Sequence, residues 1–543
     1  MTDWNFADVW EAVADSLGAA SALVQGTRRQ AWSEMDSRAD GLARALVDLG
    51  LSHQDKVAHY LFNCPEYLES MFGIFKAGLV PVNTNYRYTE DELLYIWDNS
   101  DTVAVIFHGS LADRVGPLRD AAGRVRAWIW VDDGSGPCPE WAVAYEDLVK
   151  APSGRFRPPW GRSPDDLLLL YTGGTTGMPK GVMWRQDDLF ASLNAASPIG
   201  YPEDSSLASL KELLHSPGPV ILPSCPLMHG TGMFTSLIVM SLGGCVVTLE
   251  SRNFDPATLL STLQRQGVNV LVIVGDAFGR PIVAALDAEP ERWDLSALFM
   301  VASSGVIWSE PVKEGFLRHK ASLVLADLFS SSEAVGMGSS VTSASGSAST
   351  GEFTLGKHAR VITEDGRDIE PGSAEVGVLA LEGRGPIGYY KDPEKSASTF
   401  RVIDGVRYSV PGDYAMVEAD GTVKLLGRGS VCINTGGEKV FPEEVEEAIK
   451  LFPRARDAAV VGLPDERFGE VVCAVVEPEP GSTISEKDLV AFVKTKLAGF
   501  KAPRRVVVVD TLGRSPSGKL DYARLRSLAI SSTMSSVSTA TGP

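Results

Sequence analysis

The sequence predicts an α/β multidomain protein with a large N-terminal layered α/β domain, which includes a β subunit, and a small C-terminal α+β domain. Helix-like and strand-like patterns alternate in the first part of the chain, as in sheets that are covered by helices. From Pro442 onward the chain has a separate series of helix and strand patterns. A chain of 543 residues is also too long to bury a single core, so at least two domains are expected.

The first part of the chain shows the alternation directly. Helices are predicted over the apolar repeat Leu42–Leu49, which ends at Gly50, and over Glu66–Ala77, which ends at Gly78. Strands are predicted over residues 56–61, 79–82, 103–107 and 125–131. We therefore expect a sheet with helices on both of its faces.

The middle of the chain continues with less regular patterns. A Pro/Arg/Gly-rich connector over residues 152–164 leads to an apolar run, and Gln186 opens a helix. Residues 197–219 have the pattern of an irregular insertion. Further strands are predicted over residues 244–249, 268–274 and 323–325, and the strands of a smaller β unit over residues 374–381 and 421–426.

The C-terminal part has its own series of predicted helices and strands. Pro442 begins a helix with acidic residues in its first turns, as the helix dipole favours. Ser485 caps a second helix that runs to about Leu497. Strands are predicted over residues 458–462, 471–476 and 506–509. This pattern indicates a compact α+β domain, and we expect the Ser/Thr-rich residues 529–543 to form a disordered tail.

Composition excludes several classes of protein. The net charge of -19 argues against a nucleic-acid partner, because phosphate backbones require a basic face. The six cysteines lie far apart without metal-type spacing, which favours reduced thiols and a cytoplasmic protein. The N-terminus lacks the pattern of a signal peptide, and the most apolar stretch, residues 237–249, is too short to span a bilayer. We expect no integral membrane contact.

An apolar run, Leu167–Tyr171, ends in a segment of Gly and Thr residues with one Lys. The run suits a buried strand, and the amides and hydroxyls that follow it can surround an anion. The spacing differs from that of the common ATPase loop, since Pro179 stands where that motif needs Gly. A flexible surface turn is the alternative interpretation of the Gly/Thr segment alone. Taken together, residues 171–181 predict a phosphate loop.

Residues 171–181 resemble the phosphate loop of the adenylate-forming enzymes, which include acyl-CoA synthetases, luciferases and peptide-synthetase adenylation domains. The resemblance covers residues 30–525, with the motifs in the family's order. It implies ATP, Mg2+ and CoA as cofactors and a small-molecule carboxylic acid as substrate. The implied phosphate-loop residues are Thr172, Gly173, Gly174, Thr175, Thr176, Gly177 and Lys180.

The segment Asp327–Glu333 aligns with the family's Tyr-Gly-x-Thr-Glu motif. By this resemblance Glu333 holds Mg2+ through a hard oxygen ligand, Ser332 lies near phosphate, and Phe329 lies against the adenine ring. Phe329 keeps the stacking face of the usual Tyr, and Ser330 replaces the usual Gly. Taken alone, Glu333 is better interpreted as an acidic loop residue, and the upstream phosphate loop is what favours the metal-ligand interpretation.

Two further motifs resemble the family's nucleotide and hinge segments. Asp413 ends a segment similar to the family's Tyr-Arg-Thr-Gly-Asp, in which the carboxylate accepts both ribose hydroxyls. Residues 426–446 match the family's hinge and the loop that follows it. Arg428 is the implied ribose or phosphate contact, and Ser430 occupies the hinge position that is usually Asp or Lys.

The loop after the hinge contains Gly436 and Gly437, which allow close backbone approach to a pantetheine arm. Near the C-terminus, Lys519 matches the family's Gly-Lys and is the implied cation between the substrate carboxylate and the α-phosphate. His229 matches a motif that borders the acyl pocket and the phosphates. We assign His229 a gating or positioning role rather than that of a general base, because an ionised carboxylate needs no deprotonation.

The resemblance implies an acyl-CoA synthetase with two half-reactions, adenylation of the acid and transfer of the acyl group to CoA. The implied domains are an ATP- and acyl-binding domain over residues 1–427, a hinge at 428–430 and a mobile domain over 431–528. A homodimer is retained as an expectation.

Three short segments narrow the resemblance to actinobacterial acyl-CoA synthetases of the branch that includes the sterol side-chain ligases: residues 179–185, 275–281 and 427–430. A fatty acid or a bulky apolar acid, such as a steroid side-chain acid, is the expected substrate. The acyl pocket is expected to draw on Phe234, Asp276, Ala277, residues 301–307 and Trp308, although we prefer to interpret Asp276 as a helix N-cap.

Three alternatives stay open. An acyl-AMP ligase would deliver its product to a carrier protein instead of CoA. A luciferase-like oxygenase shares the first step. A non-catalytic nucleotide-binding regulator is the third alternative, although such a protein needs neither Glu333 nor Lys519.

Overall fold

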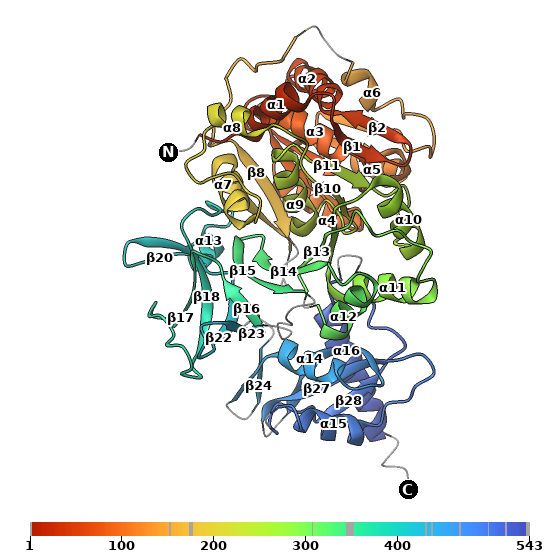
Figure 1. The fold of residues 1–543 in the computed structure, drawn as a ribbon, viewed down its shortest axis with the longest axis vertical. Helices are drawn as coiled ribbons and strands as arrows, with labels where there is room; N and C mark the ends of the chain where they lie inside the picture. Colours follow the sequence, from red (N-terminus) through yellow and green to blue (C-terminus); the bar gives the residue numbers. More distant parts are fainter. Residues whose placement is uncertain are drawn as a thin grey trace. The chain divides into compact units, whose positions relative to one another are not determined.

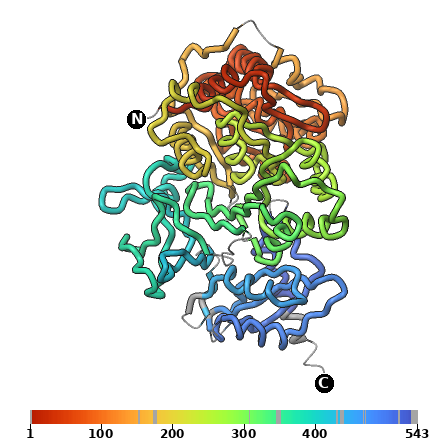
Figure 2. The backbone as a smooth tube through the Cα atoms, in the orientation of Figure 1, coloured from red at the N-terminus to blue at the C-terminus, as the bar shows by residue number. Residues whose placement is uncertain are grey.

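The computed structural model describes residues 3–150, 154–172, 178–306, 308–343, 352–428, 432–435, 438–465, 468–497, 499–515 and 518–538 (Figures 1 and 2). The chain divides into two compact units. Unit 1 comprises Met1–Ser349, Gly356–Ala359 and Leu381–Ser409. Unit 2 comprises Thr350–Leu355, Arg360–Ala380 and Val410–Pro543.

Unit 1 contains an eight-stranded sheet of order β19-β9-β8-β4-β3-β5-β6-β7. Six of its strands pair in parallel, while β9 pairs antiparallel with both β8 and β19. The strands are β3 (Lys56–Tyr60), β4 (Val80–Asn83), β5 (Thr102–His108), β6 (Ala127–Val131), β7 (Val143–Ala144), β8 (Leu167–Thr172), β9 (Lys180–Arg185) and β19 (Gly388–Tyr389).

A second sheet contributes the order β2-β1-β11-β10-β12-β13-β14-β15 to unit 1, and its strands from β1 to β14 pair in parallel. Unit 1 also holds the antiparallel pair of β20 and β21. The bounds are β1 (Ser21–Gln25), β2 (Arg28–Ala31), β10 (Val220–Pro223), β11 (Cys245–Thr248), β12 (Val270–Ile273), β13 (Met300–Ser304), β14 (Val324–Ser331), β15 (Ala334–Thr342), β20 (Phe400–Ile403) and β21 (Val406–Ser409).

The helices of unit 1 connect these strands. They are α1 (Phe6–Leu17), α2 (Trp32–Asp48), α3 (Pro65–Lys76), α4 (Glu90–Asn99), the 3-10 helix η1 (Gly109–Leu111), α5 (Ala112–Leu118), α6 (Tyr145–Leu148), α7 (Gln186–Ala196), α8 (Leu207–Leu213), α9 (Gly230–Ser241), α10 (Pro256–Gln266), α11 (Gly275–Ala288), α12 (Glu310–His319) and α13 (Pro393–Thr399). The insertion expected to be irregular, residues 197–219, contains α8, which Ser206 caps through its side chain.

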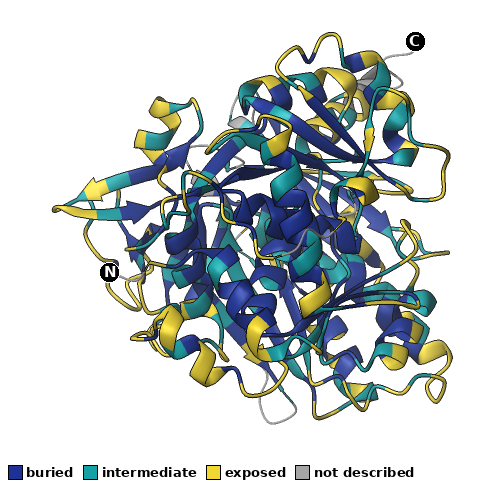
Figure 3. Cartoon of the chain, turned by 90° about the horizontal axis from the view of Figure 1, so that it is seen from above, coloured by how far each residue is buried: buried dark blue, intermediate teal, exposed yellow. Residues whose placement is uncertain are grey.

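The eight-stranded sheet has helices on both faces, as predicted. Successive side chains of β8 point to opposite faces, so Leu168 and Leu170 join one core cluster and Leu169 and Tyr171 join another. The first cluster includes residues of α1, α2 and α3, and the second includes residues of α4 and α5. Figure 3 shows the result, with strands mostly buried and exposed residues concentrated on loops and outer helix faces.

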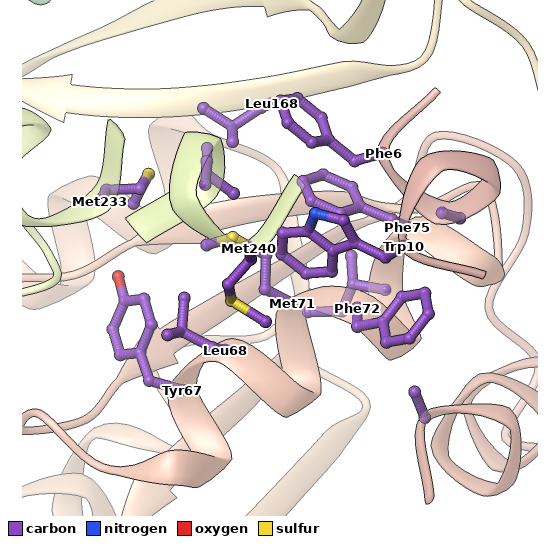
Figure 4. Close-up of a cluster of buried hydrophobic side chains, with 14 of the residues drawn as sticks. Phe6, Trp10, Tyr67, Leu68, Met71, Phe72, Phe75, Leu168, Met233 and Met240 are labelled. Carbon is purple, nitrogen blue, oxygen red and sulfur yellow. The ribbon is translucent and has the colours of Figure 1, made fainter. Parts of the chain in front are cut away.

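Aromatic rings from α1 and α3 form the centre of the first cluster (Figure 4). The rings of Phe6 and Phe75 stack at 5.4 Å between centroids, and Trp10 meets Phe72 edge-on at 5.3 Å. Each of these side chains is fully buried. Such ring pairs add packing energy beyond the burial of apolar area, so α1 is firmly attached to α3.

The start of α1 is also bonded to the start of α7. The amide of Trp4 donates to Oδ1 of Asp187 at 3.0 Å, and the amide of Phe6 donates to Oε1 of Gln186 at 3.0 Å. Both bonds are buried. The N-terminal segment therefore packs beside residues that directly follow β9.

Unit 2 holds a β unit and an α+β unit. The sequence predicted both, but it placed the β unit in the N-terminal domain, whereas most of its strands belong to unit 2. The β unit contains β16 (Glu352–Leu355), β17 (Ala359–Ile362), β18 (Val376–Glu382), β22 (Asp413–Val417) and β23 (Val423–Arg428), of which β17 and β18 begin or end at the unit boundary. The α+β unit contains β24 (Ile433–Thr435), β25 (Glu438–Val440), α14 (Pro442–Lys450), β26 (Ala455–Asp465), β27 (Gly469–Pro478), α15 (Glu486–Lys494), β28 (Arg505–Val508) and α16 (Tyr522–Ser538).

Three further features bear on the sequence predictions. Helix α16 extends to Ser538, well into the segment expected to be a disordered tail. All six cysteines are free thiols. In the described part of the chain, no helix combines the length and the apolar composition needed to cross a membrane.

A buried ionic cluster joins α1, α2 and α3 of unit 1. Lys76, which is fully buried, lies 2.6 Å from carboxylate oxygens of both Asp36 and Asp40 and 3.1 Å from Glu11. Arg162 pairs with Glu11 at 2.8 Å. Burial by itself would raise the pKa of Glu11, but hydrogen bonds from Arg162 and Arg157 and the charge of Lys76 lower it to about 2.

Glu11→Gln should reveal this cluster through its pH dependence. A carboxyl group with a lowered pKa in the folded state stabilises the fold above its ordinary pKa of 4.5, and loses that effect as the pH falls toward 2. At pH 7 the wild type should exceed the variant in free energy of unfolding by about 3 kcal/mol, and at pH 3.5 the difference should be about 1 kcal/mol smaller. Urea unfolding followed by tryptophan fluorescence measures both values, and an equal difference at the two pH values would contradict the assignment.

Candidate active site

The predicted phosphate loop joins two paired strands of unit 1. Thr172, the last residue of β8, lies opposite Lys180, the first residue of β9, in the antiparallel register. Gly173, Gly174, Thr175, Thr176 and Gly177 lie outside the described residues. The side chains of Leu168 to Leu170 are fully buried, so the β8 end of the loop is anchored in the core.

Asn83, at the end of β4, fixes the base of this loop. Its side-chain amide donates to the carbonyls of Tyr171 and Met228, both at 2.8 Å, and its side-chain oxygen accepts from the amide of Tyr171 at 2.6 Å. Met228 precedes His229, which is the N-cap residue of α9 and is partly exposed. Asn83 thus joins Tyr171, the residue before Thr172, to Met228, the residue before His229. The sequence analysis missed Asn83, although a polar residue directly after an apolar strand was a usable signal.

Glu333 lies in the tight turn between β14 and β15, where Ser331 and Ala334 pair. The side chain of Glu333 is 8% exposed. Its Oε1 accepts a hydrogen bond from the hydroxyl of Tyr389 at 2.8 Å, and its carbonyl accepts one from the hydroxyl of Ser409 at 2.6 Å. These contacts hold both the backbone and the side chain of Glu333 in a defined position.

The predicted neighbours of Glu333 are positioned by the same hairpin. Phe329 belongs to β14 and is partly exposed, as is Ser332. The indole of Trp184, on β9, donates to the carbonyl of Ser332 at 2.9 Å. Ser330, which replaces the family's Gly, accepts a hydrogen bond from the amide of Gly336 at 2.9 Å through its hydroxyl, so here the side chain closes the hairpin.

The donor set around Glu333 fits a Mg2+ ion that is delivered with a nucleotide. Mg2+ commonly takes one or two carboxylates and completes its shell with phosphate oxygens and water. Among the described residues there is no group of three or more His, Cys, Asp or Glu side chains that could hold a metal by themselves. A single, well-oriented carboxylate such as Glu333 suits the first arrangement and not a self-sufficient metal site.

Lys180 is paired with Asp392, a residue that the sequence analysis did not single out. The Lys180 Nζ lies 2.6 Å from Oδ2 of Asp392 and 6.0 Å from the ring centroid of Tyr389. The hydrogen bond from Lys180 lowers the pKa of Asp392. Lys180 and Glu333 are therefore both in contact with the short segment from Tyr389 to Asp392.

In unit 2, the structure places two predicted nucleotide contacts opposite each other. Asp413, the first residue of β22, pairs with Arg428, the last residue of β23. Asp413 is 7% exposed. Gly427, beside Arg428, has φ of +116°, a backbone conformation that residues with a side chain rarely adopt, and a Cβ there would meet the Glu443 carboxylate, so glycine is strongly favoured. Gly436 and Gly437, which lie between β24 and β25 in the sequence, are outside the described residues.

Lys519 is exposed, and a half-buried arginine holds its loop. Arg514 makes a bidentate pair with Asp457 of β26, at 2.5 and 2.8 Å, and donates to the carbonyl of Gly518 at 2.8 Å. Ser515 closes the loop, since its amide donates to the carbonyl of Lys519 at 2.8 Å and its hydroxyl accepts from the amide of Lys519 at 3.1 Å. Burial alone would lower the pKa of Arg514, but its bonds to Asp457 raise it.

One expectation about the acyl pocket is wrong. Asp276 does not cap its own helix, because the N-cap residue of α11 is Val274. Instead, the carboxylate of Asp276 accepts from the amide and the hydroxyl of Ser309, at 2.9 and 2.7 Å, and Ser309 is the N-cap residue of α12. Asp276 thus connects the starts of two helices.

Comparisons with known proteins agree with this description. Residues 10–390 match the AMP-binding enzyme family, and residues 444–519 match the AMP-binding enzyme C-terminal domain. A relative from Mycolicibacterium smegmatis, named medium/long-chain-fatty-acid-CoA/3-oxocholest-4-en-26-oate-CoA ligase, is 41% identical over 530 residues, which cover 95% of each chain. The 3-oxocholest-4-en-26-oate-CoA ligase of Rhodococcus rhodochrous is 40% identical, over 95% of this chain and 94% of the relative.

Solved structures show the same fold. The anthranilate CoA ligase AuaEII in complex with anthranoyl-AMP has a TM-score of 0.82 at 20% identity, covering 97% of this chain and 98% of that chain. ATP-bound MatB from Rhodopseudomonas palustris has a TM-score of 0.79 at 25% identity, covering 97% and 99%. The fold is that of the adenylate-forming enzymes, which confirms the predicted class. The chain belongs to the AMP-binding enzyme family.

Asp457→Asn should loosen the Lys519 loop. The amide keeps the size of the carboxylate but removes the charge that holds Arg514, so the carbonyl of Gly518 loses a well-positioned donor. We expect amide hydrogen exchange at Gly518 and Lys519 to accelerate by about tenfold, which corresponds to about 1.4 kcal/mol of local stability. Asp488→Asn is the matched control, because Asp488 pairs with Arg454 at an exposed site of unit 2. Unchanged exchange in the Asp457 variant would show that the pair does not order the loop.

Proposed function

We propose that this chain is an acyl-CoA synthetase that activates a fatty acid or a bulky apolar acid such as a steroid side-chain acid. The ligase class rests on relatives that are about 41% identical over 95% of the chain and are named as CoA ligases, so the chain is an AMP-forming acid-thiol ligase. The substrate proposal is drawn from the names of those relatives. Among the described residues, one observation carries the proposal: Lys180 and Glu333 both contact the segment from Tyr389 to Asp392. This contact places the proposed phosphate-binding cation near the proposed metal-binding carboxylate.

In the proposed first half-reaction, the carboxylate of the acid attacks the α-phosphate of ATP in line, and pyrophosphate leaves. The phosphate loop and Lys180 hold the phosphates, and Asp413 accepts the ribose hydroxyls. When bound, Mg2+ supplies positive charge next to the phosphate oxygens, and Glu333 holds it. Lys519 offsets the negative charge that develops between the carboxylate and the α-phosphate.

Adenine and the acid have their own proposed contacts. Phe329 offers a ring face to the adenine, and Ser332 lies near phosphate. His229 positions the reacting groups as the N-cap residue of α9 and does not act as a base. Trp308, expected to line the acyl pocket, is fully buried against Phe316 at 5.7 Å between ring centroids, so it supports the pocket region by packing.

In the proposed second half-reaction, the C-terminal domain turns about residues 428–430 and removes Lys519 from the site. The loop with Gly436 and Gly437 then accommodates the pantetheine arm. The thiol of CoA attacks the acyl-AMP, the thioester forms, and AMP leaves. Arg428 stays with the ribose or phosphate during this exchange. A cytoplasmic location and a homodimer remain predictions.

The first test is the release of AMP and pyrophosphate from ATP and Mg2+ with a panel of short, medium, long and steroid side-chain acids. AMP release should depend on both the acid and CoA, and should be fastest with medium or long fatty acids or with steroid side-chain acids. The same assay without CoA separates the alternatives. Acid-dependent pyrophosphate formation that CoA does not accelerate would indicate an acyl-AMP ligase that requires a carrier protein.

Lys519→Ala tests whether Lys519 acts in the first half-reaction and not in the second. Formation of acyl-AMP should slow by about two orders of magnitude, the usual scale for loss of one preorganised charge at a transition state. Discharge of supplied acyl-AMP by CoA should be retained, because Lys519 has left the site at that stage. Lys487→Ala, at an exposed position of α15, is the matched control. Full acyl-AMP formation with loss of thioester formation alone would contradict the role.

A further inference from the structure

The segment from Gly388 to Asp392 lies beside the proposed nucleotide site, and the family motifs did not include it. Its two-residue strand β19 pairs with β9, so that Tyr389 lies opposite Val182 at the edge of the eight-stranded sheet. The amide of Tyr389 donates to the hydroxyl of Ser396 at 2.8 Å. The backbone of Tyr389 is therefore held on both sides before its side chain makes any contact.

The hydroxyl of Tyr389 reaches the side chain of Glu333. The O–H donates to Oε1 at 2.8 Å, and the two residues are 6% and 8% exposed. A carboxylate whose one oxygen accepts a buried hydrogen bond loses its freedom to rotate about the last side-chain bond. The second oxygen, Oε2, then has a set direction.

The ring of Tyr389 has a separate role from its hydroxyl. It packs against Phe400 at 5.5 Å between ring centroids, and the Lys180 Nζ lies 6.0 Å from its centroid. A phenylalanine in its place keeps both of these ring contacts and removes the hydrogen bond from the hydroxyl to Glu333. The positioning role of the hydroxyl can therefore be separated from the packing role of the ring.

We propose that Tyr389 is a positioning residue of the nucleotide site, whose hydroxyl fixes Oε1 of Glu333 and so presents Oε2 to the metal ion that accompanies ATP. Partners that orient metal ligands in this way contribute strongly to metal affinity. The inference rests on the proposed function, in which Glu333 is the metal ligand. It adds the residue that sets the direction of that ligand.

Metal binding, measured apart from turnover, tests the proposal. The affinity for Mn2+ together with α,β-methylene-ATP is measured by the electron paramagnetic resonance of free Mn2+, and the affinity for the nucleotide alone is measured by calorimetry in EDTA. Tyr389→Phe should weaken Mn2+ binding by about tenfold, the lower end for loss of a residue that orients a metal ligand. Its affinity for the metal-free nucleotide should stay unchanged.

Tyr390→Phe is the matched control. It is the same substitution at the next residue, whose hydroxyl donates to Asp101 at 2.9 Å, and it should change neither affinity. Wild-type Mn2+ affinity in the Tyr389 variant would overturn the proposal. So would an equal loss of both affinities with a lower melting temperature, because that result indicates packing alone.

Glu333→Gln separates this inference from the proposed function. Weak Mn2+ binding in Glu333→Gln, together with the expected loss in Tyr389→Phe, supports both. Weak binding in Glu333→Gln with normal binding in Tyr389→Phe overturns only the role of Tyr389. Normal binding in Glu333→Gln overturns the metal-ligand role itself, and the role of Tyr389 with it.

Discussion

The antiparallel register of β8 and β9 is the constraint on which the candidate site depends. It places Thr172 opposite Lys180, so the phosphate loop begins and ends at neighbouring points of one sheet. Because β8 is buried on both faces, a shift of one residue would exchange Leu169 with its neighbours and place side chains in the wrong core cluster. The register is thus set by the two cores together. Asn83 adds to it by bonding to both backbone groups of Tyr171.

Strand β9 also connects the phosphate loop with the hairpin that carries Glu333. Trp184 on β9 bonds to the carbonyl of Ser332, and β19 pairs along β9 and carries Tyr389 to Glu333. The groups of unit 1 that we propose to bind phosphate and metal are therefore supported by one three-stranded piece of sheet. A site on paired strands is held more precisely than one on free loops, as catalysis by positioning requires.

Much of the fold was predictable because its signals are local. The helix expected over Glu66–Ala77 is α3, Pro65–Lys76, since an apolar helical repeat ending at Gly78 needs no distant information. The phosphate-loop and metal motifs stay predictions of a different kind, because they rest on residue types and an order that resemble one family. The insertion at 197–219 gave a weak signal, since α8 is short and is defined by its Ser206 cap.

The residues that the sequence analysis missed act over long distances in the chain. Tyr389 and Glu333 are 56 residues apart, and Arg514 and Asp457 are 57 residues apart. Polar contacts of this kind leave no periodic pattern in the sequence. The residues next to a single Tyr or Asp do not reveal whether a distant part of the chain supplies a hydrogen-bond partner. Asp276 shows the reverse case, in which a local cap signal was present but the carboxylate serves Ser309, 33 residues away.

The attachment of α1 to α7 has a consequence for synthesis of the chain. Helix α1 emerges from the ribosome early, yet the bonds from Trp4 to Asp187 and from Phe6 to Gln186 span 183 and 180 residues. The apolar face of α1, with Phe6 and Trp10, therefore completes its packing only after β9 and α7 have been synthesised. During this interval the part of α1 that packs against α7 lacks its final partner, even where α3 already covers Phe6 and Trp10, and exposed apolar surface of this kind is the condition under which chaperones bind and misassembly competes with folding.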